Sequence, residues 1–171
     1  MMTTRARMAV LAVAVLLFGW TLYVKSYEVA ALVGLAIALL IRSHFREGTV
    51  VLASKAFHHQ DLDKAESLLK EIRNPDRLRR GRRGFYEFIY GNIELQRGNL
   101  GKAESHFQIA SRFPLGSEND KGIVLTHLAN LNLRKKDFER AKAYISIARD
   151  LKISARVQSI IERIEKEIEK A

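Results

Sequence analysis

The stretch NLGKAESHFQIA, residues 99–110, recurs twice in the chain and decides the fold. It aligns with DLDKAESLLKEI at 61–72 and with DFERAKAYISIA at 137–148. The alanines Ala65, Ala103 and Ala141 are each 38 residues from the next. A fixed period of about 20 to 50 residues is the sequence signature of a repeat architecture. The sequence therefore predicts three copies of one structural unit.

Each copy contains the elements of two antiparallel helices joined by a tight turn. Antiparallel helices approach closely only where side chains are small, and a second small residue stands twelve positions before each repeated alanine. These residues are Ala53, Gly91 and Ala129. The predicted turns are Gln60-Asp61-Leu62, Gly98-Asn99-Leu100 and Lys136-Asp137-Phe138. We expect the Asp or Asn of each turn to cap the second helix.

This pattern resembles the tetratricopeptide repeat, a helix-turn-helix unit of about 34 residues. The resemblance implies an all-α fold with an α-solenoid of three helix pairs over 46–76, 84–116 and 122–152. The structural positions of the repeats are Ala65, Gly91, Ala103, Ala129 and Ala141. A period of 38 leaves four additional residues for each link between units. Residues 154–171 carry apolar side chains at helical spacing, which predicts a capping helix.

The resemblance also implies a groove lined by the first helix of each pair, in which tetratricopeptide modules bind peptides. The groove candidates are Phe88, Asn92, Leu95, Gln96, Thr126, Asn130, Leu133 and Arg134. An amide such as Asn92 or Asn130 can both donate to and accept from a peptide backbone. The alternative is that these asparagines are ordinary solvated residues. A chaperone-type carboxylate clamp is not expected, because Val50 and Ser54 stand where its first repeat would need Lys and Asn.

Residues 1–45 have a different character from the repeats. Two uncharged apolar runs, 8–24 and 29–41, are separated only by Lys25-Ser-Tyr-Glu28. We predict a transmembrane helical hairpin, in which the small residues Ala30, Gly34 and Ala38 offer a face for close helix packing or for another membrane protein. The alternatives are a cleaved signal peptide and a hairpin that enters the lipid without crossing it.

The basic residues near the apolar runs predict the orientation of this hairpin. Arg5 and Arg7 flank one end and Arg42 and Arg46 the other, whereas the turn holds Lys25 alone. The positive-inside rule then places both ends, and the domain at 46–171, on the cytoplasmic side of a plasma or inner membrane.

A cluster of six arginines lies in the predicted link between the first two repeats: Arg73, Arg77, Arg79, Arg80, Arg82 and Arg83. Such a cluster can contact anionic lipid near a membrane or the phosphates of a nucleic acid. Nucleic acid is the less favoured partner, because the run lacks the interleaved aromatic residues of a single-strand platform. Solvation and pairing with nearby carboxylates are equally compatible with the pattern.

Composition excludes several function classes. The 171 residues include no Cys, which removes disulfide scaffolds, thiolate catalysis and Cys-ligated metals. The five histidines are adjacent or scattered, and no phosphate-binding loop, nucleophile elbow or zinc-protease motif is present. We therefore expect no enzyme, no metal and no cofactor. The predicted function is a membrane-tethered adaptor or scaffold that binds an unidentified protein or peptide; the alternatives are a basic factor that binds nucleic acid or anionic lipid, and a structural subunit of a larger membrane complex.

Overall fold

The computed structural model describes residues 4–47 and 49–170, with the backbone alone for 4–8 and 42–47. Every regular element in this part of the chain is helical, which confirms the all-α prediction. The chain divides into two compact units, one ending at Arg79 and the other beginning at Arg80. Each unit is described by itself.

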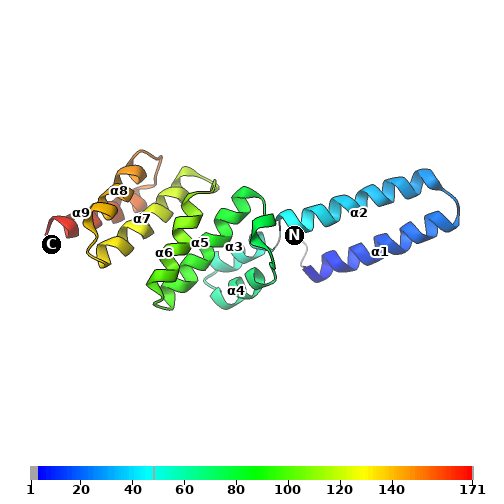
Figure 1. The fold of residues 1–171 in the computed structure, drawn as a ribbon, viewed down its shortest axis with the longest axis horizontal. Helices are drawn as coiled ribbons and strands as arrows, with labels where there is room; N and C mark the ends of the chain where they lie inside the picture. The colour runs from blue at the N-terminus through cyan, green and yellow to red at the C-terminus, as the bar shows by residue number, and fades with distance from the viewer. Residues whose placement is uncertain (1–3, 48, 171) are drawn as a thin grey trace. The chain divides into compact units, whose positions relative to one another are not determined.

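The first unit begins with a hairpin of two antiparallel helices, α1 (Thr4–Tyr23) and α2 (Tyr27–Glu47) (Figure 1). The turn between them includes Lys25 with a φ of 60°. The ring of Phe18 packs on α2 at Gly34, where a Cβ atom would lie 3.3 Å from the Phe18 Cε2 atom. Ala30 is buried and Ala38 is exposed. Gly34 thus lies where α1 packs closely on α2, whereas the exposed Ala38 does not take part in this contact.

Apolar side chains cover the outside of this hairpin. Leu16 is 75% exposed, Leu32 68% and Trp20 67%. No helix in the described residues is both long enough and apolar enough to cross a membrane. The two predicted crossings, 8–24 and 29–41, are thus not supported, since both runs are shorter than the about 20 apolar residues that a spanning helix needs.

Two shorter helices complete the first unit: α3 (Val50–His58) and α4 (Leu62–Lys70). They pack through Ala53, Ala65 and Leu69, all fully buried. The Thr49 hydroxyl donates a hydrogen bond to the carbonyl of Leu68, which ties the start of α3 to α4. A short 3-10 helix, η1 (Pro75–Arg77), follows.

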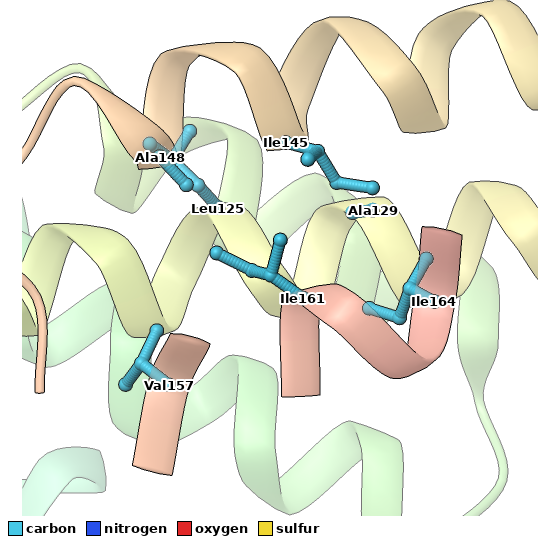
Figure 2. Packing of buried hydrophobic residues seen from close by; sticks show 7 residues of the cluster. All are labelled: Leu125, Ala129, Ile145, Ala148, Val157, Ile161 and Ile164. Carbon is cyan, nitrogen blue, oxygen red and sulfur yellow. The ribbon is translucent and has the colours of Figure 1, made fainter. Parts of the chain in front are cut away.

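The second unit contains two longer helix pairs and a final helix (Figure 1). They are α5 (Arg80–Gln96) with α6 (Leu100–Ser111), α7 (Glu118–Arg134) with α8 (Phe138–Arg149), and α9 (Ala155–Glu169). One core cluster joins α6 to α7 through Phe107, Val124 and Leu128. A second joins α7, α8 and α9 through Leu125, Ile145 and Ile161 (Figure 2). The last helix thus covers the apolar side of the pair before it.

The turn inside each helix pair repeats in its backbone geometry. Gln60, Gly98 and Lys136 have φ values of 62°, 78° and 61°, and they are 38 residues apart. In each turn the amide of the next residue donates to a carbonyl five positions earlier, as Asn99 does to Glu94. This bond belongs to a Schellman motif, which ends a helix by satisfying its last carbonyls. All three helix pairs therefore contain the same turn.

The capping of the second helices follows the prediction in two pairs of three. The Asp61 carboxylate accepts a hydrogen bond from the amide of Lys64, and that of Asp137 accepts one from Arg140, both at 3.1 Å. Asn99 makes no such cap; its side-chain amide donates instead to Glu94 at 2.8 Å. The prediction is thus confirmed for the two aspartates and wrong for Asn99.

Two further glycines allow the links to return onto the first helix of each pair. A Cβ atom on Gly84 would lie 2.9 Å from the Leu115 side chain, and one on Gly122 would lie 2.5 Å from Ile153. Gly84 and Gly122 are 38 positions apart, and so are Leu115 and Ile153. The repeated structure thus includes the links, which the sequence analysis did not detect.

Candidate binding surface

The eight predicted groove residues lie on α5 and α7 of the second unit. The two helices are neighbours at Phe88 and His127, whose ring centroids are 6.4 Å apart. The residue set therefore lies on two adjacent helices, although its members differ in what their side chains do.

Five of the eight candidates have structural roles. Phe88, Leu95 and Leu133 are partly buried and pack against the two core clusters. The Thr126 hydroxyl is buried and donates to the carbonyl of Gly122, while the Asn92 amide donates to the carbonyl of Phe88, both at 2.8 Å. Asn92 and Asn130 occupy the same repeat position, but the Asn92 amide nitrogen already serves its own helix.

Three candidates remain exposed: Gln96 on α5, and Asn130 and Arg134 on α7. Asn130 and Arg134 are four residues apart and so lie on the same face of α7. An amide and a guanidinium on one helix face can bond a peptide carbonyl and a carboxylate side by side. These three residues form the part of the predicted groove that is open to a partner.

The end of the second unit that carries the turns after α5 and α7 is rich in charge, and we call it the turn end. Two of its carboxylates, Glu94 and Glu104, are buried, whereas Glu139 is exposed and lies 3.7 Å from Lys142. Glu94 bonds Asn99 and lies 3.4 Å from Arg97; Glu104 accepts from Asn132 at 3.2 Å and pairs with Lys135. The Glu104 contacts tie α6 to the end of α7, so the two turns lie at the same end of the unit.

Three exposed cations of the turn end are not engaged in this way: Lys102, Arg134 and Lys136. No carboxylate in the described part of the chain pairs with them. A further cation, Arg140, lies 3.3 Å from the Asp137 carboxylate. The outer surface of the turn end is therefore positive.

The predicted arginine link does not form one loop. Arg73 precedes η1, Arg77 ends it, and Arg79 lies just before α5. The other three arginines belong to α5, because that helix begins at Arg80. Arg83 pairs with Glu87 at 2.9 Å and lies 5.7 Å from the centre of the Tyr86 ring. The prediction that all six lie in one link between the first two repeats is therefore wrong, because three of them lie in α5.

The sequence analysis missed two histidines that pack against aromatic rings. The His127 ring stacks flat on Phe107, with centroids 4.8 Å apart, and burial lowers the pKa of His127 from 6.5 to about 4. His106 stacks on Tyr90 and donates to the Glu87 carboxylate at 2.6 Å. A signal was present in the sequence, because His127 occupies the repeat position of the buried Ile89.

No group of three or more potential metal-ligating side chains gathers among the residues that the structure describes. The chain matched no family model, no curated protein and no solved structure.

Proposed function

We propose that the chain is a membrane-tethered adaptor, in which a tetratricopeptide-like α-solenoid at 46–171 binds a partner protein or peptide. The observation that carries the proposal is the repeated helix pair, with one turn geometry at Gln60, Gly98 and Lys136. Helix pairs of this kind bury one side of each helix and leave the first helices free to contact a ligand. The exposed Gln96, Asn130 and Arg134 supply polar groups at that surface.

Site-specific photocrosslinking in cells tests the binding surface. A photoreactive residue at Asn130 is expected to give discrete crosslinked products, because this position faces solvent on α7. The matched control is the same residue at Ser146, which is exposed on α8. Equal crosslinking at both positions, or none at Asn130, would contradict an adaptor that uses this surface.

The tether in this proposal is the α1–α2 hairpin. Apolar side chains exposed over both helices are stable in lipid and costly in water, which supports a role in membrane attachment. The small residues Ala30 and Gly34 are used within the hairpin, so its outer apolar side chains are free to face acyl chains. The hairpin shape keeps both of its ends on one side of the bilayer, whatever its depth.

Fractionation of cell membranes tests this tether. Wild-type protein is expected to stay with the lipid at alkaline pH, and Leu16→Glu with Leu32→Glu is expected to release it, since both side chains point outward. A Ser159→Glu variant, on an exposed face of α9, is the control. Retention of the double variant in the membrane would exclude the hairpin as the tether.

The side of the membrane is tested with a single cysteine. Ser159 is suited to this purpose because it is exposed, whereas Ser117 caps α7 through the amide of Asp120. Ser159→Cys is expected to react with a membrane-impermeant maleimide only after lysis, as the bias of Lys and Arg around the hairpin predicts. Labelling of intact cells would place 46–171 outside the cytoplasm.

A further inference from the structure

We propose that the turn end binds an acidic peptide segment of the partner, through Lys102, Arg134 and Lys136. This inference rests on the proposed adaptor function and names the chemistry of the partner. Its basis is the way in which the turn end separates its charges between the inside and the outside of the unit.

Two carboxylates of the turn end face inward, and the other two, Asp137 and the exposed Glu139, lie beside cations of α8. Glu94 and Glu104 are 9% and 7% exposed and bond Asn99 and Asn132. Asp137 accepts from the amide of Arg140 and lies close to its guanidinium. Glu139 is exposed but lies 3.7 Å from Lys142, and the exposed cations of the turn end outnumber its exposed carboxylates.

The cations, in contrast, face outward. Lys102, Arg134 and Lys136 are exposed, and no carboxylate in the described part of the chain neutralises them. Three such cations at one end of a unit create a positive field that an anionic ligand relieves, since opposite charges attract over about 10 Å at moderate salt. The complementary ligand is therefore acidic.

The neighbouring side chains favour a peptide over a nucleic acid. Asn130 lies one helical turn before Arg134, and Gln96 lies at the end of α5, so exposed amides accompany the cations. Amides bond the alternating N–H and C=O groups of a peptide backbone. Phe88 and His127, the rings that α5 and α7 bring together, pack on Phe107 and do not form a stacking platform for bases.

Peptide selection on the full-length protein in detergent tests this inference. The probe is a displayed library of random 12-residue peptides, and we expect the enriched sequences to have an excess of Asp and Glu. The dissociation constant of the tightest peptide is then measured for variants that neutralise three charges each.

The test variant combines Lys102→Gln, Arg134→Gln and Lys136→Gln, and we expect it to bind at least tenfold more weakly. Its matched control combines Arg163→Gln and Lys166→Gln on α9 with Lys170→Gln just after it, all at exposed positions, and we expect less than a twofold change. Both variants lose one Arg and two Lys. Thermal unfolding of each variant verifies that the fold is retained.

Several results would overturn the inference. Enrichment of neutral or basic peptides would do so and would leave the adaptor proposal intact. Equal weakening by the two triple variants would show that net charge, and not the turn end, controls binding. Binding of phosphatidylserine vesicles through the same three cations, without any enriched peptide, would assign the surface to lipid. Failure of both peptide enrichment and crosslinking at Asn130 would overturn the adaptor proposal as well.

Discussion

Within each of the pairs α5–α6 and α7–α8, the two helices cross at the same repeat positions. The residues at these positions differ between the two pairs. The first pair combines Gly91 with Phe107, and a Cβ atom on Gly91 would lie only 2.7 Å from the Phe107 ring. The second pair combines Ala129 with Ile145. The larger side chain on one helix thus accompanies the smaller residue on the other. What the repeat preserves is the space at the crossing, which a packed interior fixes within about a methyl group.

The same two pairs differ two residues before the crossing positions Gly91 and Ala129. His127 of α7 occupies the position that Ile89 holds in α5, and its ring completes a stack with Phe107. The bulky Phe107 therefore has two consequences: it requires a glycine on its own partner helix, and it offers a flat surface to the next pair. Three predictions test this comparison.

The largest effect on stability is expected when the pH is lowered. The pKa of His127 is about 4 when folded and about 6.5 when unfolded, so between these values the unfolded chain binds a proton that the folded chain does not. Stability conferred by neutral His127 is complete above pH 6.5 and is lost as the pH falls toward 4. Between pH 7.5 and 4.5 this loss is about 2 to 3 kcal/mol, measured by denaturant unfolding.

The control for this prediction is His127→Ile, which gives α7 the residue that α5 carries. Other titrating groups contribute equally to both proteins, so the variant isolates the contribution of one imidazole. We expect a shallower dependence of unfolding free energy on pH in the variant. Identical pH profiles would show that the buried histidine does not control acid stability.

A smaller effect is expected at the crossing. Gly91→Ala should destabilise the protein by about 1 to 3 kcal/mol, because the new methyl group overlaps the Phe107 ring. Adding Phe107→Ile makes the crossing resemble that of α7–α8. The double variant should then cost at least about 1 kcal/mol less than the sum of the two single changes.

Gly101 supplies the matched control for this cycle. It lies in α6 with open space around its Cα atom, so Gly101→Ala should stabilise the helix by up to about 1 kcal/mol. Thermal unfolding distinguishes the opposite signs. Strict additivity of Gly91→Ala and Phe107→Ile would refute the proposed exchange of volume.

The smallest effect is expected at the turns. Gly98 and Lys136 share a left-handed conformation that favours glycine, so Lys136→Gly should stabilise the protein by roughly 0.5 to 1 kcal/mol. The same chemical change at the exposed helical residue Lys142 should cost a similar amount. A destabilising Lys136→Gly would mean that this side chain contributes more than its backbone conformation costs.

Repetition in the sequence was sufficient to predict much of the fold. The period of 38 residues, the small residues at the crossings and the turn aspartates specify helix pairs through local preferences and close packing. The predictions that were wrong also concern local structure. Asn99 bonds Glu94 instead of capping α6, and Arg80 begins a helix where the density of arginines suggested a loop.

The candidate binding surface was less predictable than the fold. Repeat position alone selected eight groove residues, yet Phe88, Leu95 and Leu133 pack into the core. Periodicity identifies which face of a helix a residue occupies, but the depth of its burial depends on the neighbouring helix. The positive turn end could not be predicted either, because the sequence does not show which of its carboxylates are buried.

The sequence by itself determined that the chain forms three similar helix pairs behind an apolar N-terminal segment, because spacing and residue size act within one repeat. Only the tertiary structure decided that Gly34 faces Phe18, that His127 stacks on Phe107, and that Glu104 turns inward to Asn132. These contacts join residues of different helices. Their geometry depends on how the helices approach each other, which no single repeat encodes.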